Sequence, residues 1–285
     1  MKRYLIFSIV FLSFSAIAQD NRIPLDTSIV TLNSVVIKGK TIPYKATTGM
    51  QPVWNSNGKI VASLHYTYYK RTDVKDASKR PLIMSFNGGP GSASVWMHIA
   101  YTGPKILKID DEGNPIQPYG IKDNQYSVLD VADIVFINPV NTGYSRPVVG
   151  KGEKVDEKYF FGVNADAKYL ADWLTTFMTR NNRWLSPKYI IGESYGGTRV
   201  MQLANELQSR QWMYLNGVIM VSPADYKIIR SGASEDIAMN LPYFTATAWY
   251  HKMLPADLQE KDLEEILPQA ELFSYNELLP ALSKG

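Results

Sequence analysis

The chain has 285 residues, with 30 Lys and Arg against 27 Asp and Glu, and 45% of its residues are apolar. This length allows one large domain or two small ones, and this composition supports a buried core. A net charge of +3 gives little electrostatic attraction to a phosphate backbone, so we expect no nucleic-acid partner. The absence of cysteine excludes disulfides and thiol catalysis, and with only 3 histidines we expect neither a metal nor a cofactor.

The N-terminus has the pattern of an export signal. Two basic residues precede an apolar run over 4–14, and a small-x-small sequence follows at 16–18. A membrane anchor is the alternative, but this run is too short to span a hydrocarbon core of ~30 Å. We predict a signal peptide over 1–18, export to the periplasm or the extracellular space, and no membrane attachment of the mature chain.

The first part of the mature chain predicts an antiparallel hairpin. Segments 35–44 and 59–70 are rich in β-branched and aromatic residues, and the turn-forming sequence 54–58 lies between them. The charged segment 71–80 is then expected to be an exposed loop.

Short apolar strands alternate with amphipathic helices further along the chain. We expect strands at 81–86, 131–137, 188–191 and 217–221, and helices at 164–180, with Asn164 as N-cap, and around 200–207. The run 131–137 is apolar nearly throughout, as in a strand buried on both faces of a parallel sheet. This alternation predicts an α/β fold over 19–224.

After this region the pattern becomes helical. We expect helices at 241–254 and 256–267, interrupted by Pro242, Pro255, Pro268 and Pro280, and no strand follows them. Residues 225–285 are therefore expected to begin a helical insertion.

The sequence Gly192-Glu193-Ser194-Tyr195-Gly196 matches the Gly-x-Ser-x-Gly pattern of a nucleophile elbow. The glycines are needed because the serine occupies a strained turn between a strand and a helix. The expected neighbouring strand and helix supply this setting, so the motif predicts Ser194 as a nucleophile. A glycine-rich turn kept only for close packing is the structural alternative.

A second glycine-rich segment, Asn87-Gly88-Gly89-Pro90-Gly91-Ser92, follows the expected strand at 81–86. In α/β-hydrolases the corresponding loop supplies one backbone N–H of the oxyanion hole, and the residue after the nucleophile supplies another. A phosphate-binding loop is disfavoured because the Lys-Ser/Thr ending and the Gly-x-Gly-x-x-Gly spacing are both missing.

Two further segments, Gly103-Pro104 and Asn138-Pro139-Val140-Asn141-Thr142-Gly143-Tyr144-Ser145, extend this set of motifs. Together the four resemble the serine carboxypeptidase family, above all its cysteine-free bacterial members, over about residues 35–255. The resemblance implies an α/β-hydrolase fold, with a mixed, mostly parallel sheet flanked by helices and a helical lid insertion. It also implies removal of C-terminal amino acids from peptides.

The resemblance further implies the roles of six residues. Ser194 would be the nucleophile, the N–H groups of Gly89 and Tyr195 the oxyanion hole, and Asn87, Gly88 and Glu193 the substrate-binding residues, with Asn87 and Glu193 on the C-terminal carboxylate. Two positions depart from well-studied eukaryotic members: Ser85 replaces a Trp, and Tyr101 replaces a Glu that pairs with the elbow Glu. Neither an acidic pH optimum nor strict exopeptidase selectivity is therefore carried over.

The catalytic base is the third departure. An α/β-hydrolase triad runs Ser, Asp, His along the chain, and His251, the only histidine after Ser194, falls in an expected lid helix. His98 and His65 precede the nucleophile and do not fit this order. We therefore expect the chain to stop within the insertion, before its catalytic Asp and His, as a C-terminally truncated member.

These observations favour a serine-type carboxypeptidase that acts on peptides through an acyl-enzyme on Ser194. An esterase or acyltransferase on the same scaffold is one alternative, because the fold and the elbow do not fix the acyl donor. A non-catalytic peptide-binding protein is the other, and the missing histidine favours it. Nothing in the sequence specifies the oligomeric state.

Overall fold

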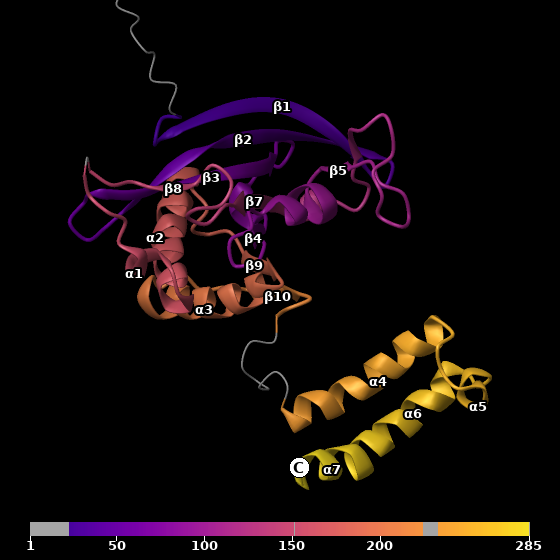
Figure 1. Cartoon of the computed structure of the whole chain (residues 1–285). Helices are drawn as coiled ribbons and strands as arrows, with labels where there is room; N and C mark the ends of the chain where they lie inside the picture. Colours follow the sequence, from indigo (N-terminus) through magenta and orange to yellow (C-terminus); the bar gives the residue numbers. More distant parts are fainter. Residues whose placement is uncertain (1–22, 151, 225–232, 285) are drawn as a thin grey trace, which may run out of the picture.

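The computed structural model describes residues 23–150, 152–224 and 233–284. It consists of a core built on one mixed sheet, followed by a group of helices (Figure 1). The predicted signal peptide lies outside the described residues, and the predicted start of the insertion, at 225, does too. Within these three ranges, no helix has the length and apolar character needed to cross a membrane.

The core sheet has the strand order β1-β2-β3-β7-β4-β9-β10, and β8 pairs with β3 off this path. The strands are β1 (Thr27–Ile37), β2 (Lys40–Trp54), β3 (Ile60–Arg71), β4 (Leu82–Phe86), β7 (Asp133–Ile137), β8 (Arg146–Pro147), β9 (Lys188–Glu193) and β10 (Gly217–Val221), while β5 (Lys105–Leu107) and β6 (Ile121–Asp123) form a separate pair. From β1 to β7 the strands pair antiparallel, and from β7 through β4 and β9 to β10 they run parallel.

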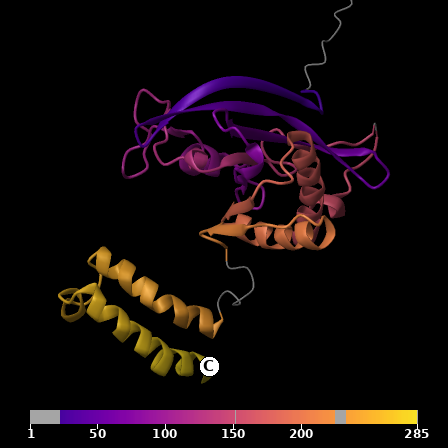
Figure 2. The same ribbon diagram turned by 180° about the vertical axis from the view of Figure 1, so that it is seen from behind.

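Helices belong to both parts of the structure, and those that lie between strands along the chain complete the predicted α/β class. In chain order they are α1 (Glu157–Phe160), α2 (Val163–Asn181), α3 (Tyr195–Arg210), α4 (Ser234–Tyr250), α5 (Ala256–Gln259), α6 (Leu263–Phe273) and α7 (Leu279–Lys284). Figures 1 and 2 show α2 and α3 beside each other on one face of the sheet. Their apolar residues, such as Trp173 and Leu203, pack with Met84 of β4 and Ile190 of β9 in the main core.

The N-terminal strands form a three-stranded meander, in which β2 and β3 are the predicted hairpin and β1 is a strand that the prediction missed. The segment expected as one strand over 35–44 contains a two-residue turn at Lys38 and Gly39, whose φ angles are +48° and +78°. A turn of this kind joins antiparallel strands directly. The second turn lies at 55–59, where the sequence predicted it.

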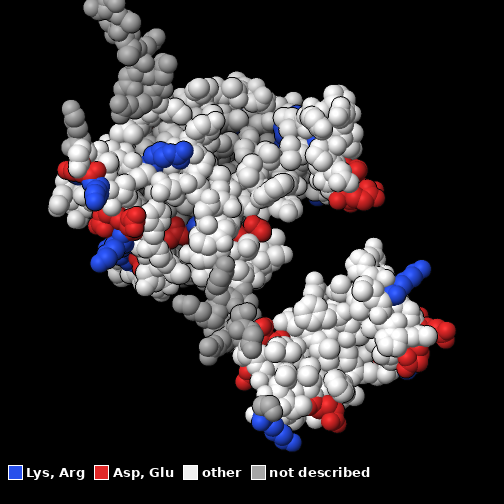
Figure 3. Space-filling view, viewed as in Figure 1, with Lys and Arg blue, Asp and Glu red and all other residues white. Residues whose placement is uncertain are grey.

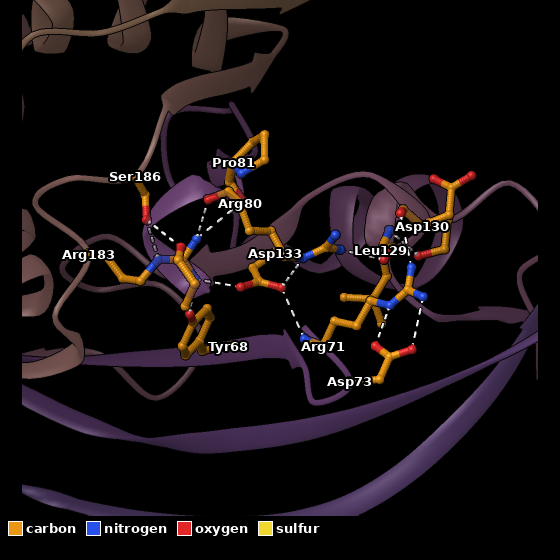
Figure 4. Close-up of polar contacts among 12 residues, drawn as sticks. Tyr68, Arg71, Asp73, Arg80, Pro81, Leu129, Asp130, Asp133, Arg183 and Ser186 are labelled. Carbon is orange, nitrogen blue, oxygen red and sulfur yellow. Dashed lines mark hydrogen bonds and ion pairs between the residues drawn. The ribbon is translucent and has the colours of Figure 1, made fainter. Parts of the chain in front are cut away.

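The segment 71–80, expected as an exposed loop, is anchored at both ends by a buried carboxylate. Asp133 of β7 accepts hydrogen bonds from the Arg71 backbone N–H at 3.0 Å, from Arg80 Nε at 2.7 Å and from Arg183 at 2.5 Å (Figure 4). Arg183 also donates to the hydroxyl of Tyr68. The two arginines compensate the charge of the buried carboxylate, whereas a buried carboxylate without a partner would be strongly destabilising.

Two smaller expectations also need correction. Helix α2 has Gly162 as its N-cap, and Asn164 lies inside the first turn. Pro242 and Pro268 lie within α4 and α6 and interrupt neither helix. Helices α4 and α6 contact each other, for example through the Trp249 indole N–H, which donates to the carbonyl of Lys261 just before α6. In both views α4, α5, α6 and α7 lie apart from the core sheet (Figures 1 and 2).

Candidate active site

Ser194 occupies a sharp turn between β9 and α3. Its φ is +59° and its ψ is −125°, a combination that costs energy for any residue with a side chain. Three backbone hydrogen bonds hold the turn: the Ser194 N–H donates to Val221, and its carbonyl accepts from Gly197 at 2.8 Å and from Ala224 at 3.0 Å. The serine therefore has the strained strand–turn–helix setting of a nucleophile elbow.

The glycines of the elbow leave no space for side chains. A Cβ on Gly192 would lie 2.0 Å from the carbonyl oxygen of Gly196, and a Cβ on Gly197 would lie 2.7 Å from Pro223. Close packing and the serine conformation thus coexist, so the packing alternative explains the glycines but not the strain at Ser194.

The glycine-rich loop after β4 lies directly against this elbow. A Cβ on Gly88 would lie 2.6 Å from the backbone nitrogen of Tyr195 and 2.7 Å from the carbonyl oxygen of Glu193. Gly89 follows with a φ of +108°, which favours glycine. The two segments that carry the predicted oxyanion donors, Gly89 and Tyr195, are therefore brought together.

Asn87, the first residue of the loop, is fully buried and bonded through every polar group. Its side-chain Nδ2 donates to Glu193 Oε2 at 2.9 Å, and its Oδ1 accepts from the Met97 N–H at 3.0 Å. Its backbone N–H donates to the hydroxyl of Ser94 at 3.3 Å. A carboxamide and a carboxyl group thus contact each other beside the elbow. They belong to the two residues that the resemblance assigns to the C-terminal carboxylate of a substrate.

A buried ion pair, which the sequence analysis did not identify, contacts the start of the glycine-rich loop. Arg199 of α3 donates to the backbone carbonyl of Asn87 at 2.5 Å and, through Nε, to Asp166 of α2 at 2.6 Å. Asp166 also accepts from the hydroxyl of Tyr169, which in turn accepts from the Val140 N–H at 3.1 Å. Burial raises the pKa of Tyr169 well above its ordinary value, so this hydroxyl keeps its proton.

A signal for this pair exists in the sequence. Asp166 precedes Leu170 by one helical turn, and Arg199 lies one turn before Leu203, so both charges occupy the apolar faces of their helices. A charge at such a position is buried only when it is paired. The partner comes from another helix, however, and periodicity alone does not identify it.

The segment that begins with Asn138 contacts the end of the glycine-rich loop at Ser94. Asn138 Oδ1 accepts from the Ser94 N–H at 2.9 Å, and its Nδ2 lies 3.0 Å from His65 Nδ1. Gly143 passes so close that a Cβ there would lie 2.5 Å from Asn138 Nδ2. The Asn138–Ser145 motif therefore supports the glycine-rich loop.

A groove of about 320 Å³ opens beside Tyr195. It runs between the loop residues Pro90 and Gly91 and the start of α2, and most of its lining is apolar or aromatic: Pro139, Val140, Phe160, Phe161, Val163 and Tyr169. The Asp166–Arg199 pair also borders it. A pocket of this composition suits an apolar group.

The three histidines are engaged away from Ser194. His65 lies 3.1 Å from the Thr48 hydroxyl as well as contacting Asn138, and His98 bonds the Tyr69 hydroxyl at 2.7 Å and stacks on Phe136. His251 is exposed just after α4, with its ring edge against Tyr250. In the described parts of the chain, Ser194 thus has no histidine partner, and no cluster of three or more metal-ligating side chains occurs there.

The two departures from the family motif are visible in the structure. Ser85 is fully buried in β4, and its hydroxyl finds no hydrogen-bond partner within the described residues. Tyr101 is half exposed, and its carbonyl accepts from Asn124 at 2.9 Å. Neither side chain supplies a carboxyl group, so Glu193 has no acid partner at the position of Tyr101.

Comparisons with known proteins agree with these motifs. Residues 39–269 match the family model of serine carboxypeptidases. Two Arabidopsis thaliana proteins, serine carboxypeptidase-like 36 and 29, are each 31% identical, over 169 and 154 residues that cover 56% and 53% of this chain and 31% and 29% of the relatives. The chain thus spans about a third of the length of these curated relatives.

Among solved structures, the chain resembles that of Kex1, a prohormone-processing carboxypeptidase from Saccharomyces cerevisiae. The TM-score is 0.54 at 17% identity, and the match covers 85% of this chain and 52% of that one. At this identity the likeness concerns the fold alone, which is that of an α/β-hydrolase.

Proposed function

Because the chain belongs to the serine carboxypeptidase family, we propose that the protein that contains these residues removes C-terminal amino acids from peptides through an acyl-enzyme on Ser194. The observation that carries the proposal is the hydrogen bond between Asn87 and Glu193 beside the elbow. It places an amide donor beside a carboxyl group, and Glu193 directly precedes Ser194. A free C-terminal carboxylate is proposed to bind to these two side chains by hydrogen bonds.

The chemistry begins with attack of Ser194 Oγ on the scissile carbonyl. A general base takes the hydroxyl proton and later gives it to the leaving amine. The N–H groups of Gly89 and Tyr195 stabilise the oxyanion that forms, and water then hydrolyses the acyl-enzyme. The contact of Gly88 with the elbow supports this pairing of the two amides.

Recognition of the carboxylate requires hydrogen-bond donors. Asn87 Nδ2 is one donor beside the elbow. A carboxamide in place of the Glu193 carboxyl group would keep the shape of the side chain and add a donor, whereas an aliphatic side chain would remove every polar atom from this position. Substitutions of Glu193 therefore test its part in binding a free C-terminus.

The groove beside Tyr195 is proposed to hold an apolar side chain of the peptide next to the scissile bond. Aromatic and aliphatic residues dominate its lining, and the Asp166–Arg199 pair at its border is mutually neutralised. Peptides with large apolar side chains are therefore the proposed substrates, in preference to charged ones.

Peptide binding tests this proposal without requiring turnover. Calorimetry would compare an N-acylated dipeptide with its C-terminal amide. We expect the free acid to bind at least about tenfold more tightly than the amide. Glu193→Gln, which has a hydrogen-bond donor at this position, should keep the preference, and Glu193→Leu should abolish it. Equal binding of acid and amide would reject the proposal.

A non-catalytic peptide-binding protein is the second candidate. The placement of His65, His98 and His251 favours it, because none of them contacts Ser194. The binding experiment gives the same result for both candidates, and reactivity of Ser194 separates them.

Export is part of the same proposal. N-terminal sequencing of secreted protein should begin at Gln19, after the small-x-small sequence. Secreted material that retains Met1 would contradict the predicted signal peptide.

A further inference from the structure

The outermost strand of the meander, β1, extends beyond the core. Its inner side pairs with β2, and within the described ranges no other strand pairs with its outer side. Residues 28–34 are exposed on both faces of the sheet, whereas Val35 and Ile37 near its end are buried. Most of this 11-residue strand is therefore an open edge.

The backbone groups that face this edge can be identified from one hydrogen bond. The N–H of Val36 points outward, because it donates to the Asp123 side chain of β6 at 2.9 Å. Backbone groups alternate in direction along a strand. The N–H and C=O groups of Ser28, Val30, Leu32 and Ser34 consequently point outward as well.

This edge lacks the features by which natural edge strands avoid pairing. The strand Thr27–Ile37 contains no charged residue and no proline, and its register with β2 is unbroken from Thr27 opposite Met50 to Ile37 opposite Lys40. Charges, prolines and bulges are the usual protection. In Figure 3, viewed as in Figure 1, the upper rim along β1 shows neither blue nor red.

We propose that β1 pairs antiparallel with β1 of a second copy of this chain, with a two-fold axis beside Thr31. This register places Val30 opposite Leu32 of the other copy, and Ser28 opposite Ser34. Each pair consists of outward-facing residues, so both backbone hydrogen bonds of each pair can form. The two sheets then join into one continuous sheet.

The side chains favour a second copy over an unrelated strand. Val30 is 51% exposed and Leu32 is 78% exposed, and they lie on the same face, so the two copies together form a four-residue apolar cluster. Thr31 faces Thr31 of the other copy in a non-hydrogen-bonded pair, an arrangement in which Thr–Thr contacts are favourable. No like charges oppose each other, because β1 has none.

Symmetry limits the assembly to two chains. Each copy contributes the same edge to the contact, so the interface is isologous and closes on itself. In the dimer the outer edge of each β1 is paired, so β1 cannot pair with a further strand.

Disulfide trapping tests the register directly, because the chain has no cysteine of its own. In a Thr31→Cys variant the two introduced thiols face each other across a non-hydrogen-bonded pair, where Cα atoms are ~4.5 Å apart, within disulfide range. In Asn33→Cys the two thiols are offset by four residues, or ~13 Å. We expect Thr31→Cys to cross-link at least tenfold faster on mild oxidation. Equal rates, or faster cross-linking of Asn33→Cys, would overturn the register.

Sedimentation velocity of the full chain tests the interface itself. We expect a dimer that Leu32→Lys dissociates, raising the dissociation constant at least tenfold, because two added lysines lie diagonally across the axis. Leu185→Lys adds the same charge at a residue that is 84% exposed in the loop after α2, and should leave the dimer unchanged. A monomer at all concentrations, or equal effects of the two substitutions, would overturn the proposal. A raised dissociation constant of the Leu32→Lys dimer shows that β1 forms the interface, whether or not Ser194 is catalytic.

Discussion

The guanidinium group of Arg199 donates a hydrogen bond to the backbone carbonyl of Asn87, while its Nε bonds Asp166. One side chain thereby ties the helix that follows the nucleophile to the loop that faces it. The Arg199 guanidinium also lies over the ring of Tyr195, at 5.1 Å from its centre. The relative position of loop and elbow is thus fixed by α2 and α3, through contacts between buried charges.

Replacing Arg199 should therefore be costly. Arg199→Met leaves the Asp166 carboxylate buried without its partner, and breaking such a pair from one side costs about 3–5 kcal/mol. Lys59→Met breaks an ion pair with Glu153 in which both side chains are more than half exposed, so water screens the pair and we expect little loss of stability. Urea unfolding of both variants measures the difference, and equal losses would contradict a structural role for Arg199.

Gly88 should not accept even one methyl group. In Gly88→Ala, the new Cβ would lie 2.6 Å from Tyr195 N and 2.7 Å from Glu193 O, both backbone atoms, so the loop must move away from the elbow. Overpacking of this kind costs about 1–3 kcal/mol. The control is Gly120→Ala, where the nearest atom to the new Cβ is Lys108 Cε at 3.9 Å, and we expect a change of at most about 0.5 kcal/mol in thermal or urea unfolding. Similar stability of the two variants would show that the loop is not in contact with the elbow.

His98 should make stability depend on pH. Burial lowers the pKa of His98 to about 4, and the positive charge of His65 contributes less. Because the unfolded chain binds this proton at a pKa near 6.5, the unfolded state holds more protons between pH 6.5 and 4, and stability falls as the pH is lowered through this window. The full effect is about 3 kcal/mol.

The experiment is urea unfolding at pH 7, 5.5 and 4. His98→Phe keeps an aromatic ring against Phe136 but binds no proton, so the fall in stability below pH 6.5 should be smaller by this amount. His251→Phe, at an exposed histidine, is the control and should follow the parent chain. Parallel curves for His98→Phe and the parent chain would exclude His98 as the cause.

Local sequence patterns predicted the elements that carry the site, but not the contacts that hold them together. The strands at 81–86 and 217–221 and the elbow at Ser194 are each specified by neighbouring residues, and the structure has them in place. The Arg199–Asp166 pair joins residues 33 positions apart, and Asn87 meets Glu193 from 106 positions away. Only the strand order, with β4 beside β9, brings these partners together, and the turn at Lys38 was missed because a lysine rarely adopts a positive φ.

The last prediction concerns the reactivity of Ser194 in this chain. A serine hydroxyl is a weak nucleophile at neutral pH unless an adjacent base takes its proton. His251, the only histidine after Ser194, is exposed beyond α4 and contacts Tyr250. Loss of one triad member leaves only ~10³–10⁴-fold catalysis over water, from the oxyanion hole and from binding. We therefore expect slow hydrolysis of peptides by residues 19–285.

Labelling with a fluorophosphonate probe measures this reactivity, with Ser194→Ala as the control. We expect labelling of the purified chain to be no faster than that of the control, because the probe reacts with an activated serine and not with an ordinary one. Rapid labelling that disappears in Ser194→Ala would contradict the prediction and would require a base within the chain. His251→Ala would then identify it: the variant would lose the labelling if His251 reaches the elbow, and retain it if another group activates Ser194.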